Sequence, residues 1–267
     1  MKYDLIISDY DWTLGTSPAK ISEENLAAIR DYMSRGGKFS VVTGRSFSSI
    51  EDICLSHGLK IVVGCFQGAD IVDLRTEKHL FTDGIDHKLA AKAVNDLLVE
   101  GVPVVAWSGD TLFYREPSYY TEQYLGVEKV KLVKTSDVAA SVLKAGKPVS
   151  KVCAVTREEQ TAGFLQKYSA KYGDVLAVNS GAKRLVEIIK PELNKGFAVR
   201  FIANYLGVPL SKVMAVGDSF NDIEMMDKEW FGVAVGDGDE SLKKRAKEVT
   251  VPYTESAIAH LIKKYCG

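Results

Sequence analysis

The stretch IISDYDWTLG, residues 6–15, places two aspartates, Asp9 and Asp11, one residue apart and directly after an apolar run. Two carboxylates this close repel each other, so the stretch predicts that a positive group is held nearby. Similar runs that end in a small or acidic residue recur as LIIS before Asp9, FSVV before Thr43, KVMAV before Gly217 and GVAV before Gly236. Continuous apolar runs of this length are typical of parallel strands covered on both faces.

The composition sets limits on size and partners. The chain has 267 residues, of which 46% are hydrophobic and 26% charged, and a chain of this length favours two domains over one. The net charge of -1 provides no basic field for nucleic acid or anionic lipid. We therefore expect neither a nucleic acid nor a membrane as a partner.

The cysteines and the apolar segments indicate a cellular compartment. Four cysteines are widely spaced without a CxxC pair, which predicts buried thiols in a reducing environment: Cys54, Cys65, Cys153 and Cys266. The N-terminal stretch MKYDLIISDYD is too short in apolar residues for a signal-peptide core, and no segment reaches the length of a membrane span. These features predict a cytoplasmic protein.

Both ends of the chain alternate between strand and helix patterns. The segment 22–37, SEENLAAIRDYMSRGG, predicts a helix with Ser22 as its N-cap and Gly36-Gly37 as its stop. From about residue 190 the alternation returns as the helix NKGFAVRFIANYLG, the strand KVMAVGD, the short helix NDIEMMDK, the strand GVAV and the helix ESLKKRAKEV. Strand, helix and strand in succession build a doubly wound parallel sheet.

The middle of the chain has a different pattern. VPVVAWSGDTLFYRE predicts a hairpin that turns at residues 108–110, and four further segments predict strands: KVKLV, KVCAVT, DVLAVN and RLVEII. Helices are expected near residues 137–145 and 157–172, the second opening with a capping box of Thr156 and Glu159. We interpret residues 83–189 as an α+β domain inserted into an α/β core of residues 1–82 and 190–267.

Polar residues collect just after the apolar runs, where open α/β sheets bind ligands. These residues are Asp9, Asp11 and Thr13, then Thr43, Gly44 and Arg45, then Gly217, Asp218, Asn221 and Asp222. Four carboxylates form an oxygen-ligand set suited to Mg²⁺, and Lys195, at the start of a predicted helix, is the obvious counter-charge. A single aspartate after a strand commonly only caps the next helix, but four together favour a site.

Four segments in order resemble the motifs of the haloacid dehalogenase-like phosphohydrolases: DYDWT, VVTG, the lysine of LNKG, and GDSFND. The inserted domain between the second and third motifs resembles the type II cap of the Cof-type branch. The resemblance spans the whole chain. It implies a Rossmann-like core with an inserted cap, and a Mg²⁺-dependent phosphatase for small phosphate monoesters such as sugar phosphates or phosphorylated cofactors.

The resemblance also implies residue roles. Asp9 would be the nucleophile that forms an aspartyl-phosphate, and Asp11 the general acid and then the general base. Lys195 would offset charge, while Thr43, Gly44, Arg45 and Asn221 would bind the phosphoryl group or substrate. Magnesium would be held by Asp9, the carbonyl oxygen of Asp11, Asp218 and Asp222. Arg45 could equally pair with a surface acid.

Two positions depart from the branch pattern. Trp12 stands where glycine is usual, so either the position makes no unusual backbone demand or Trp12 shapes the mouth of the pocket. Gln67 stands where asparagine is common. Candidates for contacts to the leaving group in the inserted domain are Trp107, Tyr114, Arg115, Glu116, Asn179, Lys183, Arg184 and Glu187.

Two other functions use the same residues. A phosphotransferase or mutase would pass the phosphoryl group from Asp9 to a second hydroxyl rather than to water. A non-catalytic phospho-acceptor module would also gather carboxylates, a lysine and Mg²⁺ at strand ends. Asp11 and the large insertion favour the enzyme.

Overall fold

The chain folds into two compact units, each with its own sheet. The computed structural model describes residues 1–16, 20–127 and 129–267. The first unit contains Met1–Thr43, Ile53–Leu80 and Asn194–Gly267, and the second contains Gly44–Asp52 and Phe81–Leu193. Each unit is described by itself below.

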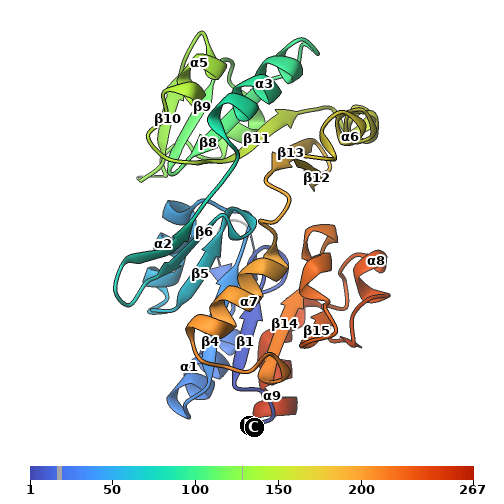
Figure 1. Cartoon of the computed structure of the whole chain (residues 1–267). Coiled ribbons are helices and arrows are strands. Elements are labelled where there is room, and N and C mark those ends of the chain that lie inside the picture. Colours follow the sequence, from blue (N-terminus) through green and yellow to red (C-terminus); the bar gives the residue numbers. More distant parts are fainter. Residues whose placement is uncertain (17–19, 128) are drawn as a thin grey trace. The chain divides into compact units, whose positions relative to one another are not determined.

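The first unit is built on an eight-stranded sheet in the order β16-β15-β14-β1-β4-β5-β6-β7 (Figure 1). The strands are β1 Leu5–Ser8, β4 Lys38–Val42, β5 Val62–Cys65, β6 Asp70–Asp73, β7 Lys78–Thr82, β14 Val213–Gly217, β15 Phe231–Ala234 and β16 Glu248–Val249. All pairings from β16 to β5 are parallel, and β6 is antiparallel to β5. The predicted parallel core is confirmed, with an antiparallel extension at one edge.

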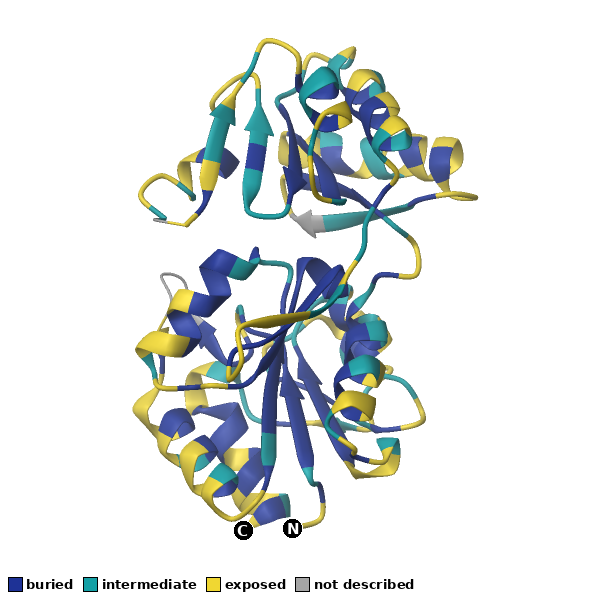
Figure 2. Ribbon diagram, turned by 60° about the vertical axis from the view of Figure 1, so that its left-hand side comes forward, coloured by how far each residue is buried: buried dark blue, intermediate teal, exposed yellow. Residues whose placement is uncertain are grey.

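Helices flank this sheet on both faces, so its central strands are buried (Figure 2). They are α1 Glu23–Ser34, α7 Lys195–Tyr205, α8 Glu240–Lys243 and α9 Ala257–Cys266, with 3₁₀ turns η1 Phe66–Gly68, η2 Leu210–Lys212, η3 Phe220–Met225 and η4 Tyr253–Glu255. Helix α2 Phe47–Ser56 belongs to the second unit as far as Asp52 and to the first unit from Ile53. Strand β2 Gly15–Thr16 pairs antiparallel with β3 Lys20–Ile21. Helix α7 packs on β4, β5, η1 and η3, while α1 packs on α9.

Most predicted elements of the first unit are present, with two differences. Ser22 caps α1 by accepting a hydrogen bond from the Asn25 amide at 3.2 Å, as expected. The predicted helix 240–249 is wrong beyond Lys243, because its last residues form β16 and pair with β15. The segment NDIEMMDK begins within the 3₁₀ turn η3 rather than an α-helix.

The second unit has a six-stranded sheet in the order β10-β9-β8-β11-β13-β12. Its elements are α3 His87–Leu98, β8 Val104–Ser108, β9 Thr111–Tyr114, α4 Tyr119–Glu122, β10 Lys131–Lys134, α5 Val138–Leu143, β11 Val149–Val155, α6 Glu158–Tyr172, β12 Ala177–Ala182 and β13 Leu185–Ile189. The predicted hairpin is confirmed as β8 and β9. Residues of α3, α5 and α6 pack with one face of the sheet into a single apolar core.

The capping box predicted for α6 is wrong by one residue. The Arg157 backbone amide donates to Oε1 of Gln160 at 3.2 Å, while the Gln160 amide donates to the Arg157 backbone carbonyl at 2.9 Å rather than to a side chain, so this half of a capping box begins at Arg157 rather than Thr156. The Thr156 hydroxyl instead hydrogen-bonds the Thr161 hydroxyl at 2.7 Å inside the unit. Thr156 is thus buried one residue before the N-cap of α6.

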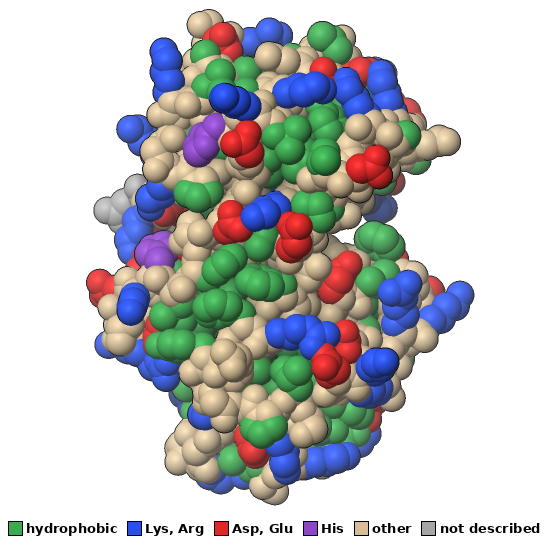
Figure 3. Space-filling model, in the orientation of Figure 1, with side chains coloured by type: hydrophobic (Ala, Val, Ile, Leu, Met, Phe, Trp, Pro, Cys, Tyr) green, Lys and Arg blue, Asp and Glu red, His purple; other side chains and the backbone are tan. Residues whose placement is uncertain are grey.

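The cysteines and the surface agree with the composition. All four cysteines are free and buried, as predicted. Acidic and basic side chains are interspersed on the face shown in Figure 3. Among the described residues, no helix has the length and apolar content needed to cross a bilayer.

Candidate active site

The candidate site of the first unit lies at the carboxyl ends of β1, β4 and β14. Ser8 of β1 is in register with Val41 of β4 and with Val216 of β14. The Asp9 amide donates to the Val216 carbonyl at 2.8 Å, which ties the residue after β1 to its neighbour. Because the chain proceeds from β1 to β4 on one side and places β14 on the other, this edge is the switch point at which α/β sheets bind ligands.

Lys195 lies between two buried carboxylates. Its Nζ is 2.6 Å from Oδ1 of Asp9 and 2.6 Å from Oδ1 of Asp222, and it also donates to Oδ1 of Asn221 at 3.3 Å. The Lys195 side chain is 1% exposed. Lys195 is the first residue of α7, and the Asn194 side chain caps that helix by accepting from the Phe197 amide. The capped start of α7 therefore determines where the Lys195 ammonium lies.

Asp222 organises the loop after β14. Its Oδ2 accepts from the backbone amides of Asp218 and Ser219, each at 3.0 Å, while its Oδ1 accepts from Lys195. A Cβ on Gly217 would lie 2.6 Å from Cβ of Asp222, so only glycine permits this close approach. The loop thus presents Asp218 toward the site, where its Oδ1 accepts from the Thr13 hydroxyl at 3.1 Å.

Burial and mutual repulsion shape the electrostatics. Burial raises the pKa of Asp9 well above its usual value, an effect that Lys195 opposes and that Asp222 and Asp218 reinforce. Burial, with Asp222 beside it, raises the pKa of Asp218 to about 6. Burial disfavours the charged form of Lys195, but Asp222 and Asp9 outweigh it and raise the pKa of the ammonium. The charged forms of these carboxylates are therefore incompletely compensated by Lys195 alone.

This donor set fits a divalent cation. Asp9, Asp218 and Asp222 offer carboxylate oxygens that all lie within 4.8 Å of one another. Carboxylates are the ligands that Mg²⁺ prefers, and a bound cation would supply the positive charge that the cluster needs. Of the two neighbouring aspartates after β1, the Asp9 side chain therefore belongs to the acidic cluster and the Asp11 side chain does not.

The remaining predicted residues lie around this cluster or in the second unit. Asp11 is partly buried and forms a bridge with Gly15, and Thr43 is buried, its amide donating to the Gly64 carbonyl at 2.8 Å. Gly44 and Arg45 belong to the second unit, where the Gly44 carbonyl accepts from Lys151 at 3.2 Å.

Three residues near the site received no role from the sequence. Thr13 bonds Asp218, and the Ser219 hydroxyl donates to Oδ1 of Asn221 at 2.7 Å. The Gln67 amide donates to the Thr43 carbonyl at 2.9 Å from a left-handed backbone with φ 62°. Thr13 and Ser219 lie inside the motifs DYDWT and GDSFND, and their position in these motifs could have marked them as site residues.

Two proposed leaving-group contacts in the second unit are structural. Trp107 is fully buried, with its indole N–H donating to the Tyr120 hydroxyl at 3.0 Å. Glu187 is also buried and accepts from Lys151 Nζ at 2.5 Å. Packing and ion pairing therefore explain both, and we withdraw them as substrate contacts.

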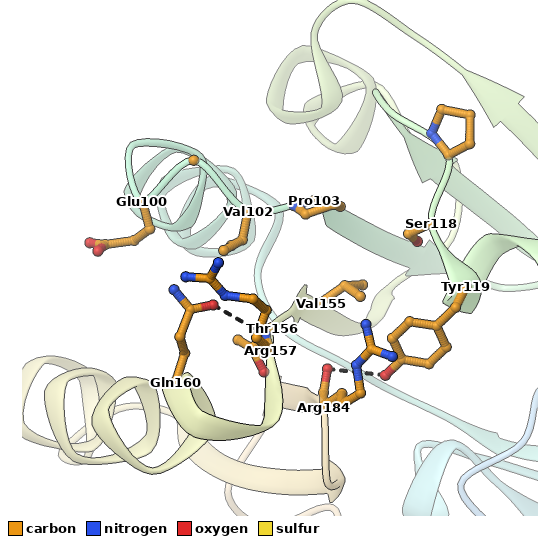
Figure 4. A pocket seen from close by; sticks show the side chains of 12 residues that line it. Glu100, Val102, Pro103, Ser118, Tyr119, Val155, Thr156, Arg157, Gln160 and Arg184 are labelled. Atoms are coloured by element: carbon orange, nitrogen blue, oxygen red, sulfur yellow. Dashed lines mark hydrogen bonds between the residues drawn. The ribbon is translucent and has the colours of Figure 1, made fainter.

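The second unit also contains a cavity of about 500 Å³ (Figure 4). The proposed contact Arg184 lines it, with its guanidinium carbon 4.7 Å from the ring centre of Tyr119. Arg157 and Gln160, at the start of α6, form another part of the wall. These residues lie in the second unit, so this cavity is distinct from the acidic cluster.

Comparisons with known proteins agree with this fold. A 5-amino-6-(5-phospho-D-ribitylamino)uracil phosphatase of Bacillus subtilis is 26% identical, over 98% of this chain and 97% of its own length. An Arabidopsis thaliana protein named as a chloroplastic endoribonuclease is 28% identical over 99% of this chain, which spans only 47% of that protein. A crystal structure of a haloacid dehalogenase-like hydrolase from B. subtilis has a TM-score of 0.86 at 24% identity, over 97% of this chain and 99% of that one.

A family model covers nearly the whole chain. The model described as haloacid dehalogenase-like hydrolase matches residues 6–262, from the opening strand to the last helix. The match includes all four quoted motifs and the inserted segment between them. The chain therefore belongs to the haloacid dehalogenase-like hydrolase family.

Proposed function

We propose that the protein is a Mg²⁺-dependent phosphatase that hydrolyses small phosphate monoesters through an aspartyl-phosphate on Asp9. The observation that carries this proposal is the buried contact of Lys195 with Asp9 and Asp222, beside Asp218. A phosphate dianion repels an attacking carboxylate, so the reaction needs preorganised positive charge next to the nucleophile. Lys195 supplies part of that charge.

The mechanism has two displacements at phosphorus. In the first, a carboxylate oxygen of Asp9 bonds to phosphorus, the bond to the ester oxygen breaks, and Asp11 donates a proton to that leaving oxygen. In the second, Asp11 accepts a proton from water as the water oxygen attacks phosphorus, which releases phosphate and restores Asp9. Thr43 and Asn221 would hold phosphoryl oxygens by hydrogen bonds, with Gly44 and Arg45 extending the loop toward the substrate.

Asp9, Asp218, Asp222 and the carbonyl oxygen of Asp11 would hold the cation. When bound, Mg²⁺ offsets the charge of the phosphoryl group and of these carboxylates. The oxygens of Asp222 also accept from Lys195 and two backbone amides, so Asp222 would orient Lys195 and the loop as well as face the cation.

The substrate class is a small phosphorylated metabolite. The B. subtilis relative is named for a phosphate monoester of this size, which supports sugar phosphates and phosphorylated cofactors as candidates. We propose that residues 83–189 act as the cap that selects the leaving group. A cytoplasmic site of action belongs to the proposal and is supported by the four buried free thiols.

The test is phosphate release from a panel of sugar phosphates, nucleotides and phosphorylated cofactors, with Mg²⁺ and with chelator. Wild type should release phosphate only with metal, and Asp9→Asn should reduce kcat by at least about a thousandfold. Asp31→Asn, which changes an exposed aspartate of α1, is the matched control and should keep full activity. Release that persists in Asp9→Asn contradicts the mechanism.

The products distinguish the alternative functions. Transfer to a second sugar hydroxyl, with no phosphate released to water, would identify a phosphotransferase or mutase. For a non-catalytic phospho-acceptor, Asp11→Asn should leave the decay of the phosphorylated protein unchanged. The phosphatase reading predicts that Asp11→Asn greatly slows both formation and hydrolysis of the phosphorylated state.

A further inference from the structure

Trp12 has a backbone conformation that is unfavourable for its side chain. Its φ is 61°, in the left-handed region that L-residues other than glycine seldom adopt. The alternative that position 12 requires no unusual backbone angle is therefore wrong. Trp12 follows Asp11, the proposed proton donor, and a bulky residue held in such a conformation next to a candidate catalytic residue is a recognised sign of a functional constraint.

The turn around Trp12 is held by hydrogen bonds. The Trp12 amide donates to the Gly15 carbonyl at 2.9 Å, and the amides of Leu14 and Gly15 donate to the Tyr10 carbonyl at 3.1 and 2.9 Å. The backbone that carries Asp11 is thereby fixed, and with it the direction in which the Trp12 side chain leaves the chain.

The Trp12 ring is exposed and supported on one side. The residue is 51% exposed, and its ring centre lies 5.5 Å from that of Tyr253 in an edge-to-face contact with an interplanar angle of 84°. Tyr253 is itself positioned, because its amide donates to Oδ1 of Asp237 at 3.0 Å. Trp12 and Tyr253 together form an aromatic wall.

The other two tryptophans differ from Trp12. Trp107 and Trp230 are 0% and 1% exposed, and their indole N–H groups donate to the Tyr120 hydroxyl and the Met225 carbonyl. They stabilise the two cores by burying apolar area. Trp12 buries only about half of its surface from a strained backbone, so folding gains comparatively little from its ring. The contrast with the two buried tryptophans indicates that Trp12 serves in binding a ligand rather than in stabilising the core.

We propose that the aromatic wall contacts the leaving group, and that the enzyme favours phosphate esters whose leaving group carries a planar ring. The proposal rests on the proposed function, because Asp11 as proton donor must meet the leaving oxygen, and Trp12 is the next residue. A flat ring can stack on indole or meet its edge, whereas an acyclic or puckered group makes fewer contacts. Trp12 is then a specificity-determining residue.

Three primary alkyl phosphates test the preference: benzyl phosphate, cyclohexylmethyl phosphate and glycerol 1-phosphate. Wild type should show a kcat/KM for benzyl phosphate that exceeds that for cyclohexylmethyl phosphate by roughly five- to tenfold. Trp12→Gly should abolish this ratio mainly through KM, and Trp12→Phe should retain part of it. Glu77→Gly relieves a left-handed backbone (φ 57°) at an exposed turn and is the matched control, with the wild-type ratio expected.

A binding experiment separates this inference from the proposed function. Because Trp107 and Trp230 are buried, acrylamide quenches chiefly the fluorescence of Trp12. In Asp9→Asn, benzyl phosphate should reduce the quenching constant about twofold, and glycerol 1-phosphate should reduce it less. Equal protection by both ligands, or a wild-type ratio near one, overturns the inference even if phosphate is released. Protection of Asp9→Asn by benzyl phosphate, together with no phosphate release from any ester by wild type with Mg²⁺, supports the contact and overturns the proposed reaction.

Discussion

At the scale of single residues, the acidic cluster is organised by compensation of buried charge. Lys195 donates to Asp9 and Asp222, and each of these side chains is nearly inaccessible to solvent. Removing one partner of a buried ion pair leaves the other charge uncompensated, which costs much more than losing a pair at the surface. The stability of the first unit therefore depends on which member of the cluster is changed.

Lys195→Met should lower the free energy of unfolding by about 3 to 5 kcal/mol, because it leaves the buried carboxylates of Asp9 and Asp222 without their positive partner. Lys190→Met is the control: its partner Asp83 lies at 2.5 Å, but both side chains are more than a third exposed, and we expect a loss below about 1 kcal/mol. Urea denaturation in chelator measures both changes. Equal losses would contradict the assigned role of burial.

Asp9→Asn should not destabilise the metal-free protein, in contrast to Lys195→Met. It removes one of three mutually repelling carboxylates, so the melting temperature in chelator should equal or exceed that of wild type. Adding Mg²⁺ should raise the melting temperature of wild type, because a ligand that binds only the folded state stabilises it. That increase should shrink in Asp9→Asn and in Asp218→Asn. A collapsed melting temperature for Asp9→Asn in chelator would count against the cluster as described.

At the scale of elements, a polar contact joins α3 and α6 in the second unit. The Asp96 carboxylate of α3 accepts from Lys92 on the same helix and from Lys171 and Tyr172 of α6. Burial tends to raise the pKa of Asp96, but the hydrogen bonds from Lys171, Lys92 and Tyr172 outweigh it and hold that pKa well below its ordinary value. The ionised form of Asp96 therefore stabilises the packing of these two helices.

This contact predicts a pH-dependent stability. A carboxyl group whose pKa is lowered on folding contributes its full stabilisation above its unfolded pKa of about 3.9, and loses it as the pH falls toward the folded value. Asp96→Asn should thus cost about 1 to 2 kcal/mol at pH 7, and the difference from wild type should narrow below about pH 5. Denaturation curves across this range measure it. A difference that is constant with pH would show that charge is not the cause.

At the scale of the whole molecule, the two units have separate cores and separate sheets. Separate cores open with separate free energies, so a ligand should protect mainly the unit that binds it. Mg²⁺ should slow hydrogen exchange in β1 and β14 of the intact chain much more than in β8 and β11. Uniform protection across both sheets would indicate that the units unfold together.

The sequence alone predicted the parallel core, the inserted hairpins and the residues that gather at the strand ends. Continuous apolar runs, helix caps such as Ser22, and glycines at helix ends are local signals, and the parallel order follows from how strand and helix alternate. The same information brought Asp9, Asp218 and Asp222 together, since strand ends of one sheet share an edge. All of these predictions follow from local sequence patterns and from the order in which the elements alternate along the chain.

Tertiary contacts decided what local patterns could not. Trp107 and Glu187 are packed and paired by residues distant in the sequence, and β16 exists because β15 offers a pairing edge. Sequence by itself thus determined which side chains gather at the sheet edge, and the three-dimensional structure decided their burial and their partners, because those depend on contacts between residues far apart in the chain.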